Sequence, residues 1–345
     1  MEDKNYSILV IGAGAIGGIT AALLRKNGHN VEILCRQEEY AKLISDKGIE
    51  ISGVCGKFSI RIPAYSSIKD INGRKDFILH ATKATELPES AAVAMTVLKE
   101  SGYIVSMQNG ICEDALAEIV GKDKVIGCVT GWGATMEAQG KFTMTSTGDF
   151  IIGYPQKLAD EKLNDLAKIL SSVVPAKVTD NIYGHLYSKL IVNACITSLG
   201  AICGLYLGKM LAIKKVRKIF IEIIRESVLV AESMGINIEV FGGKLDFKSF
   251  SRKHGLLNDF RNHLVILIIG FKYRRLKSSS LQSLERGKKT EVEYFNGYIT
   301  LNAKKYNLKV PVNESVVRII HEIESGIRRI AIDNFNDPAF DSFND

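Results

Sequence analysis

Short apolar runs alternate with helix-like stretches over the first half of the chain. Ser7 to Ile11 has the composition of a buried strand and leads into glycines. Residues 19–26 then have helical spacing, and residues 31–34 are again strand-like, which predicts a β-α-β unit of about 30 residues. Further strands are predicted at 77–80, 103–106 and 125–129, and helices at 89–99 and 113–120. This alternation predicts an α/β domain with a doubly wound parallel sheet.

The pattern changes in the second half of the chain. A Gly- and Thr-rich stretch, 131–153, predicts antiparallel strands that cap the first domain. Residues 214–234 then carry apolar side chains at helical spacing, with Ser227 the small exception on that face, which is typical of an amphipathic helix. Residues 279–306 and 313–329 have the same pattern. We therefore predict three parts, namely the α/β domain over 1–181, an all-helical domain over 182–332 and a frayed tail over 333–345.

Composition excludes several broad classes of protein. Hydrophobic residues make up 46% and charged residues 24% of the chain, which indicates a folded protein rather than a disordered one. The six cysteines form no C-x-x-C pair and the six histidines lack the spacing of metal ligands, so no metal site is predicted. Acidic residues precede the first strand, which is unlike a signal peptide, and we expect a cytoplasmic protein.

The net charge of +7 is concentrated in one segment. Residues 251–290 contain ten Lys or Arg against Asp259 and Glu285, a local +8 that leaves −1 for the remainder. Since no nucleic-acid motif accompanies this segment, a solvated helix face is favoured over a nucleic-acid site. The apolar run Leu264 to Phe271 is far shorter than the roughly 20 residues of a membrane span. It predicts a buried or interfacial helix, and it leaves a homodimer open.

The first strand is followed by a G-x-G-x-x-G motif that opens the first helix. In that context the first glycine permits a tight turn and the second lets the backbone approach a pyrophosphate. The third permits close helix packing, and the helix N-terminus favours the negative charge. We therefore predict a Rossmann-type dinucleotide-binding domain, with a glycine-rich turn that has no ligand as the alternative. The predicted cofactor-binding residues of this loop are Gly12, Ala13, Gly14, Ala15, Ile16 and Gly17.

Arg36 stands where NAD-binding domains usually place an acid, at the end of the second strand. Its guanidinium could fork onto a 2′-phosphate, whereas Glu32 lies inside the strand, four residues too early. NADP is therefore favoured over NAD. A solvent-facing arginine without a ligand is the alternative.

Four motifs resemble the ketopantoate reductase family over nearly the full length of the chain. They are GAGAIGG with Arg36, Thr82-Lys83, Gln108-Asn109-Gly110, and Ser188 to Asn193 paired with Ser278 to Gln282 and Thr290-Glu291. The resemblance implies a cytoplasmic enzyme that reduces 2-dehydropantoate to pantoate with NADPH, for pantothenate and coenzyme A biosynthesis. Its partner would be a small 2-oxo acid, with neither nucleic acid nor a membrane.

The resemblance also implies site residues. It assigns cofactor binding to Lys83, Asn109 and Glu291, catalysis to Lys189 as general acid and Glu291, and substrate binding to Asn109, Lys189, Asn193, Thr197 and Ser279. These residue types suit the chemistry, because hydride delivery builds negative charge on the ketone oxygen and a lysine can protonate it. Lys189 and Asn193 are four residues apart, so they share one face of a helix, and Thr197 continues that face.

Alternatives remain open for several of these residues. Lys189 could be a surface lysine, Glu291 could pair with Lys288 or Lys289, and Asn109 could be a turn residue. Thr197 stands where the family commonly has a second asparagine. Its single hydroxyl does not replace the paired donor and acceptor of an amide. The alternatives are thus a reductase of another 2-oxo or 3-oxo acid, or a non-catalytic NADPH-binding sensor.

Overall fold

The computed structural model describes residues 5–251 and 255–344, with side chains from residue 259 onward in the second range. The chain divides into two compact units, Met1–Ile182 and Tyr183–Asp345. The predicted boundary after residue 181 lies one residue from this division.

The first unit is built on a mixed eight-stranded sheet in the order β12-β11-β8-β7-β6-β1-β2-β5. These strands are β1 (Ser7–Ile11), β2 (Asn30–Leu34), β5 (Ala64–Tyr65), β6 (Lys75–His80), β7 (Leu98–Ser106), β8 (Val125–Thr130), β11 (Phe150–Gly153) and β12 (Ala176–Val178). Neighbouring strands are parallel except for β8 and β11, which are antiparallel. The predicted doubly wound sheet is confirmed, because the chain leaves β1 toward β2 on one side and reaches β6, β7 and β8 on the other.

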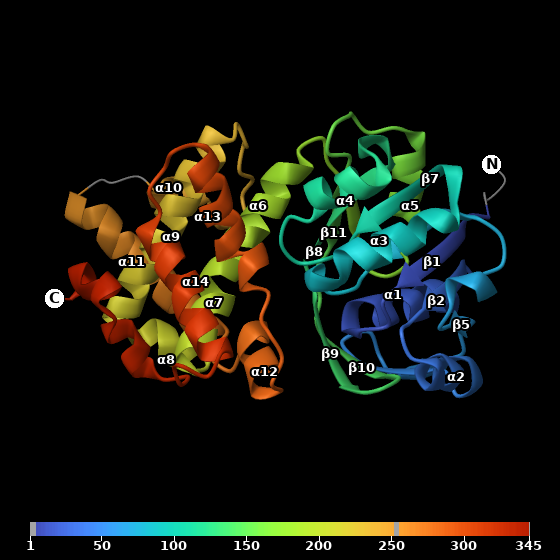
Figure 1. Cartoon of the computed structure of the whole chain (residues 1–345), viewed down its shortest axis with the longest axis horizontal. Coiled ribbons are helices and arrows are strands. Elements are labelled where there is room, and N and C mark those ends of the chain that lie inside the picture. Colours follow the sequence, from blue (N-terminus) through green and yellow to red (C-terminus); the bar gives the residue numbers. More distant parts are fainter. Residues whose placement is uncertain (1–4, 252–254, 345) are drawn as a thin grey trace. The chain divides into compact units, whose positions relative to one another are not determined.

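Helices connect the parallel strands and cover the sheet (Figure 1). They are α1 (Ala15–Lys26), α2 (Glu38–Asp46), α3 (Leu87–Thr96), α4 (Glu113–Val120) and α5 (Glu161–Leu170). The predicted helix over 89–99 extends too far, because Leu98 already pairs with Lys75 as the start of β7. Right-handed crossovers in opposite directions from β1 place α1 and the α3–α4 pair on opposite faces of the sheet.

A second sheet of four strands packs against α1. Its order is β4-β3-β10-β9, formed by β3 (Ile49–Gly53), β4 (Phe58–Ile60), β9 (Gly133–Ala138) and β10 (Lys141–Ser146). The antiparallel pair predicted within 131–153 is confirmed for β9 and β10. Residues 150–153 instead join the main sheet, and β3 and β4 were not predicted. The packing is close, because a Cβ on Gly18 would lie 2.6 Å from the Phe142 ring.

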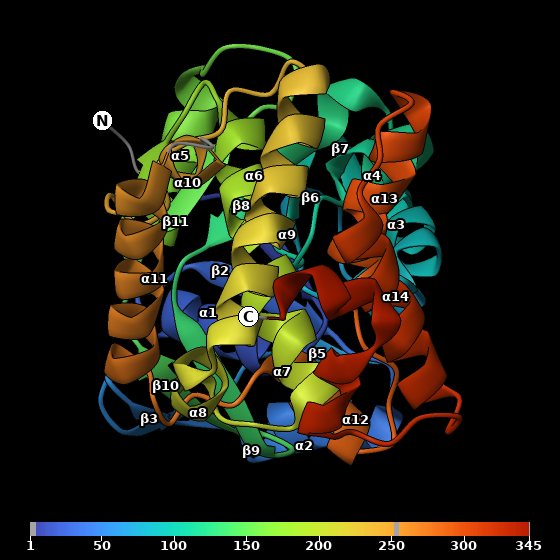
Figure 2. The same ribbon diagram turned by 90° about the vertical axis from the view of Figure 1, so that its left-hand side faces the viewer.

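The second unit is helical, as predicted. Its helices are α6 (Ile182–Val192), α7 (Ser198–Cys203), α8 (Leu207–Ala212), α9 (Lys214–Ser233), α10 (Phe247–Ser251), α11 (Gly255–Lys272), α12 (Ser279–Glu285), α13 (Asn296–Lys305) and α14 (Pro311–Glu324). Figure 2 shows α9 in the middle of the unit, with α11 along one edge and α13 and α14 along the other. The residues that form the predicted apolar face of α9 are all buried, namely Val216, Phe220, Ile223, Ser227 and Val230.

Two expectations for the second unit are wrong. The predicted helix over 279–306 is two helices, α12 and α13, separated by residues 286–295, where Gly287 adopts a positive φ. The tail is not frayed within its described residues, because it forms 3-10 turns with Phe335 and Phe340 buried. The carboxylate of Asp337 also pairs with two arginines, Arg318 at 2.7 Å and Arg328 at 2.9 Å.

Two apolar segments of the second unit differ in exposure. The helical stretch Ile182–Cys203 is long and apolar enough to cross a membrane, but 78% of its most apolar window is buried inside the protein, as in the core helix of a soluble protein. The predicted run in α11 has one side exposed, with Ile268 57% and Phe271 74% exposed. All six cysteines are free thiols, and five of them are buried.

Candidate functional site

The glycine loop between β1 and α1 is tightly packed except at one position. A Cβ on Gly12, where φ is 103°, would lie 2.8 Å from the backbone of Ala81 and Thr82. A Cβ on Gly17 would lie 2.1 Å from the carbonyl oxygen of Gly12. At Gly14, by contrast, no atom of the described residues beyond its chain neighbours and its own helix backbone lies within 4 Å of the Cβ position. The loop is therefore closed on the protein side and open at its middle glycine.

The open side of the loop has the features of an anion site. Gly14 is the N-cap of α1 and provides no side-chain acceptor, and the first turn of α1 contains no acidic residue. Backbone N–H groups at such a helix start favour negative charge. The hydroxyl of Tyr40, on α2, donates to the Ala13 carbonyl at 2.9 Å and fixes the loop from the other side. Sequence reasoning missed Tyr40, for which no motif gives a signal.

Two charged residues, one within β2 and one just after it, have different environments. Glu32 forms an ion pair with Lys75 at 2.6 Å, and both side chains are largely buried. Glu32 is thus committed to a structural pair. Arg36 follows β2 with its side chain 71% exposed, and its Nη2 lies 2.8 Å from Oε1 of Glu86. Glu86 was not among the predicted site residues.

A hydrogen-bond network joins two of the predicted motifs. The amide of Gln108 donates from Nε2 to the Thr82 hydroxyl at 3.2 Å and to the Lys83 carbonyl at 3.1 Å. Lys83 itself is exposed and is the N-cap of the 3-10 turn η2 (Ala84–Glu86). Asn109 is half-buried, and the following Gly110 has a φ of 88°, so its Asn-Gly pair does form a turn. The structure therefore brings Lys83 and Asn109 to neighbouring loops at the carboxyl ends of β6 and β7.

Glu113, the first residue of α4, is a buried carboxyl group beside these loops. It is 1% exposed, and neither carboxylate oxygen has a well-aligned hydrogen-bond partner within the described residues. Burial raises the pKa of Glu113 to about 7, with the nearby Ser106 hydroxyl opposing the shift. This side chain was also missed, because a glutamate at a helix start ordinarily lies in solvent.

Replacing Glu113 with glutamine is expected to stabilise the protein in alkaline solution. A carboxyl group whose folded pKa is raised contributes stability below its unfolded pKa of about 4.5, and that contribution is lost as the pH rises through about 7. Near pH 8.5 Glu113→Gln should therefore exceed wild type by about 3 kcal/mol, with little difference near pH 5. Urea unfolding at both pH values measures this. Glu118→Gln, an exposed residue of the same helix, should change neither value. A variant less stable than wild type near pH 8.5 contradicts the prediction.

In the second unit the predicted site residues Asn193 and Thr197 bound a π-helical turn. This turn, Asn193–Thr197, interrupts the run from α6 into α7. A step of four residues rotates slightly more than one full turn about the axis of an α-helix, but slightly less than one full turn in the wider π-helix. The sideways displacement from Asn193 to Thr197 is therefore opposite in direction to the displacement from Lys189 to Asn193. The three side chains fall closer to one line than a plain helix would place them, and π-turns occur often at functional sites.

Buried polar groups hold the π-turn in place. Asn296, at the start of α13, donates from Nδ2 to the Ala194 carbonyl at 3.3 Å, and its Oδ1 accepts from the Ser198 hydroxyl at 2.5 Å. Its Nδ2 also donates to Oδ1 of Asn313 at 2.8 Å, and Asn313 donates to Glu226 at 2.7 Å. Asn296 and Asn313 are fully buried. The turn is therefore a supported feature of the core.

The other predicted residues of this unit differ in exposure. Ser279 is exposed in the first turn of α12, whereas Ser278 is the N-cap and accepts from the Leu281 N–H at 3.2 Å. Helix α12 packs against α7 and the π-turn, so Ser279 belongs to the same part of the unit as Asn193. Lys189 and Glu291 are half-buried. Nδ2 of Asn193 is buried without a hydrogen-bond partner in the described part of the chain.

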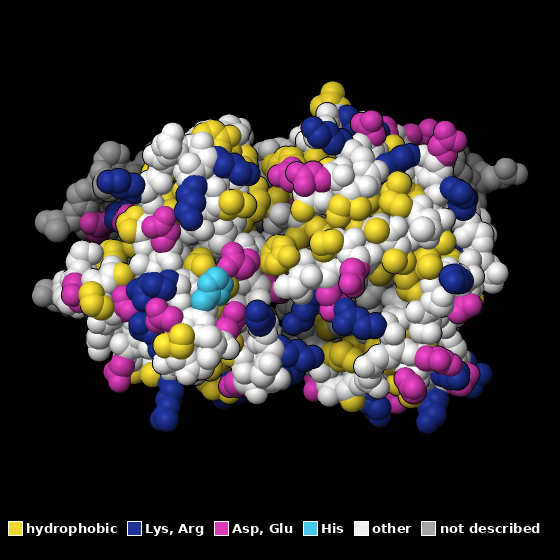
Figure 3. Space-filling model, viewed as in Figure 1, with side chains coloured by type: hydrophobic (Ala, Val, Ile, Leu, Met, Phe, Trp, Pro, Cys, Tyr) yellow, Lys and Arg dark blue, Asp and Glu magenta, His cyan; other side chains and the backbone are white. Residues whose placement is uncertain are grey.

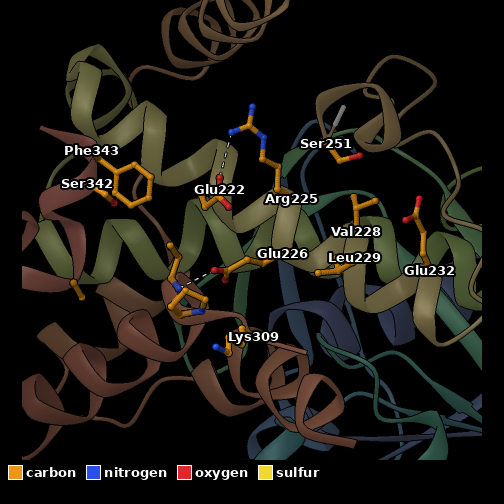
Figure 4. A pocket seen from close by; sticks show the side chains of 13 residues that line it. Glu222, Arg225, Glu226, Val228, Leu229, Glu232, Ser251, Lys309, Ser342 and Phe343 are labelled. Atoms are coloured by element: carbon orange, nitrogen blue, oxygen red, sulfur yellow. Dashed lines mark hydrogen bonds and ion pairs between the residues drawn. The ribbon is translucent and has the colours of Figure 1, made fainter. Parts of the chain in front are cut away.

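A cavity of about 650 Å³ lies elsewhere in the second unit, between α9 and the tail (Figure 4). Figure 4 shows Glu222 and Arg225 joined above it and Glu226 pointing toward the start of α14. Glu226 accepts from the Val312 N–H at 2.9 Å and the Asn313 N–H at 2.8 Å. Burial nevertheless raises its pKa to about 7. None of the predicted site residues lines this cavity.

Charged side chains of both signs are interspersed over the face of the helical unit in Figure 3. The segment 251–290 agrees with the expected solvated face in its described residues, since Arg274 and Arg275 are exposed and Lys277 pairs with Glu285 at 2.6 Å. Among the described residues no group of His, Cys, Asp and Glu could hold a metal ion.

Comparison with known proteins gives consistent matches over both units. The family model described as ketopantoate reductase PanE/ApbA matches residues 8–157, and the model of its C-terminal part matches residues 181–324. The 2-dehydropantoate 2-reductase of Pyrococcus abyssi is 30% identical over 309 residues, or 89% of this chain and 94% of that protein.

Solved structures agree in fold. A PanE/ApbA family ketopantoate reductase from Ralstonia eutropha has a TM-score of 0.79 at 24% identity, covering 93% of this chain and 99% of that one. A D-mandelate dehydrogenase solved with NADH and anilino(oxo)acetate also has a TM-score of 0.79, at 22% identity and the same coverage. At these identities the likeness concerns the fold alone.

Proposed function

Because this chain belongs to the ketopantoate reductase family, we propose that it reduces 2-dehydropantoate to pantoate with NADPH. It is an NADP-dependent oxidoreductase acting on a CH–OH group. The net reaction takes a 2-oxo acid, NADPH and one proton to a 2-hydroxy acid and NADP⁺. The proposal places this step in pantothenate and coenzyme A biosynthesis.

The first unit would hold the cofactor through its glycine loop. The open position at Gly14 fits a pyrophosphate, and the N–H groups at the start of α1, which have no side-chain cap from Gly14, would bind its charge. Arg36 would contact the 2′-phosphate, with Lys83 and Asn109 on the adjoining loops. When bound, NADPH supplies the hydride. Glu291 is proposed to contact the cofactor as well as to orient the catalytic lysine.

Lys189 would supply the proton. Negative charge develops on the ketone oxygen as the carbonyl carbon accepts hydride, and an ammonium group donates a proton to that oxygen. The carboxylate of Glu291 would hold the amine in position. Asn109, Asn193, Thr197 and Ser279 would bind the rest of the substrate.

One observation carries the substrate half of this proposal. Nδ2 of Asn193 is buried and lacks a hydrogen-bond partner among the described residues, four positions from Lys189. A buried amide donor left unpaired costs about 1–3 kcal/mol. An oxygen of the substrate would satisfy it.

Turnover of a panel of oxo acids tests the proposal. The loss of absorbance of NADPH, and separately of NADH, would be followed with 2-dehydropantoate, pyruvate and a bulky aryl 2-oxo acid. The proposal expects the highest kcat/KM with 2-dehydropantoate and NADPH. Binding of NADPH without turnover of any oxo acid would instead support the non-catalytic sensor.

A related substrate is the second candidate, and Thr197 is the observation that favours it. Its side chain is 5% exposed within the π-turn, and it presents one hydroxyl where a second amide is common in the family. Mispaired polar groups in a closed site discriminate strongly between substrates. A larger kcat/KM for another oxo acid would favour this candidate. We also propose a cytoplasmic location, in agreement with the buried Ile182–Cys203 helix.

We propose in addition that the chain forms a homodimer through α11. The exposed apolar side chains in the described part of this helix, from residue 259 onward, share one face, and they are Phe260, Leu264, Leu267, Ile268 and Phe271. This face continues into a groove of about 860 Å³ whose floor is apolar and whose charged lining residues are cations, among them Arg274 and Arg275. Antiparallel pairing of α11 with a second copy would bury this face on both chains about a two-fold axis.

Sedimentation velocity checks this assembly. Wild type should sediment as a dimer, and Ile268→Glu should sediment as a monomer, because burying a carboxylate in the apolar contact is costly. Leu301→Glu places the same charge on α13 at a residue that is 55% exposed, and it should stay dimeric. A monomeric wild type contradicts the proposal.

A further inference from the structure

Glu86 is the charged residue that the structure adds to the predicted cofactor site. It ends the 3-10 turn η2, three residues after Lys83. Its Oε1 lies 2.8 Å from Nη2 of Arg36, although the two residues belong to loops on opposite sides of β1. The guanidinium assigned to the 2′-phosphate therefore already has an anionic partner from the protein.

The backbone of Glu86 is held in place, whereas the ion pair is open to solvent. The Glu86 N–H donates to the Lys83 carbonyl at 2.9 Å, and the Glu86 carbonyl accepts from the Ser90 hydroxyl at 2.6 Å. Ser90 is itself joined to the buried His80 at 2.7 Å. The Arg36 and Glu86 side chains are 71% and 38% exposed. Arg36 is thus free to turn toward a ligand, while Glu86 stays beside the site.

We propose that Glu86 sets cofactor selectivity by competing with the 2′-phosphate for Arg36. This inference rests on the proposed placement of the 2′-phosphate at Arg36. A phosphate monoester carries a charge of about −1.5 to −2 near neutral pH. When Arg36 binds it, Glu86 loses part of its ion pair and faces a second anion, so binding of NADPH is weakened.

NADH meets the opposite situation at the same residue. Its ribose 2′-hydroxyl is a hydrogen-bond donor, and an acid near that position is what NAD-binding domains use to accept it. Glu86 can accept this hydrogen bond while Arg36 remains paired. The one carboxylate therefore disfavours NADPH and favours NADH, which narrows the NADP preference that Arg36 alone would confer.

Titration of both cofactors into Glu86→Gln tests the proposal. The Kd values for NADPH and NADH would be measured without substrate, from the fluorescence of the reduced nicotinamide. The Kd for NADPH should fall about three- to tenfold, as expected for an exposed charge pair together with removal of like-charge repulsion. The Kd for NADH should rise or stay unchanged. The gain should shrink at about 1 M salt, where the screening length is about 3 Å.

Two further variants separate the competing explanations. Glu89→Gln removes the same charge from an exposed position in the first turn of α3, and it should leave both Kd values unchanged. Equal effects of Glu89→Gln and Glu86→Gln would show a general charge effect and overturn the proposal. In an Arg36→Gln background, Glu86→Gln should lose most of its benefit for NADPH.

Failure of this inference differs from failure of the proposed cofactor site. If Arg36→Gln leaves the Kd for NADPH unchanged, the 2′-phosphate does not bind at Arg36. The proposed phosphate contact and the proposed competition by Glu86 are then both refuted. If Arg36→Gln weakens NADPH while Glu86→Gln leaves the ratio of the two Kd values unchanged, the cofactor site stands and the competition by Glu86 is refuted.

Discussion

Lys189→Ala is expected to lower kcat by about 10² to 10⁴, the usual contribution of general acid catalysis. Without the ammonium group, water must protonate the alkoxide that forms when hydride reaches the carbonyl carbon. The Kd for NADPH should stay within about twofold, because the proposed role of Lys189 concerns the substrate oxygen and not the dinucleotide. Single-turnover oxidation of NADPH with 2-dehydropantoate measures the chemical step directly.

Chemical rescue distinguishes a proton donor from a structural lysine. Methylamine added to Lys189→Ala should restore part of the rate, with a dependence on the concentration of its protonated form. Lys304→Ala, which removes an exposed lysine from the last turn of α13, should retain full activity. A Lys189→Ala variant with wild-type kcat would refute the assignment of Lys189 as the general acid.

Alanine at two glycines of the same loop is expected to have opposite effects. At Gly17 the new methyl would lie 2.1 Å from the Gly12 carbonyl oxygen. Since backbone cannot yield as a flexible side chain does, Gly17→Ala should lower the Tm of the cofactor-free protein by on the order of 10 °C. At Gly14 the methyl meets open space, so the cofactor-free Tm should stay within about 2 °C.

For the Kd of NADPH, Gly14→Ala is the variant with the larger expected effect. The methyl of Gly14→Ala would occupy the space proposed for the pyrophosphate, so the Kd for NADPH should rise at least about tenfold. The Tm increase that NADPH gives wild type should then be largely lost. Differential scanning calorimetry with and without NADPH measures both effects. Normal NADPH binding by Gly14→Ala would place the pyrophosphate elsewhere.

The first unit was predictable because its signals are local. The glycine motif, the strand before it and the helix after it occur within one short stretch, and each constrains the same backbone. The pairing of Arg36 with Glu86 was not predictable, because 50 positions separate them and neither charge belongs to a periodic pattern. The burial of Glu113 was not predictable either. The apolar and polar positions of α4 form an amphipathic pattern whether its first residue is buried or exposed.

The second unit shows where periodicity is insufficient. The apolar face of α9 was predicted correctly because it extends over five turns. The break between α12 and α13 depends on Gly287 and its positive φ, which a helical pattern on both sides concealed. The tail was mistaken for a frayed end because its overall polarity outweighed two buried aromatic side chains, Phe335 and Phe340.

The π-turn at Asn193–Thr197 has a consequence for how this helix can change during evolution. Deleting one residue within the turn would restore ordinary α-helical hydrogen bonds and would leave the residues after it nearly in place, because a π-turn holds one more residue than an α-turn in about the same rotation and rise. Gly200, whose Cβ position lies 2.7 Å from the Ser278 hydroxyl oxygen, would therefore keep its close contact with the start of α12. The alignment of Asn193 and Thr197 with Lys189 would change, because it depends on the extra residue. New substrate preferences can therefore arise here by loss of one residue from the turn as well as by replacement of Thr197, without disturbing the packing of the rest of the helix.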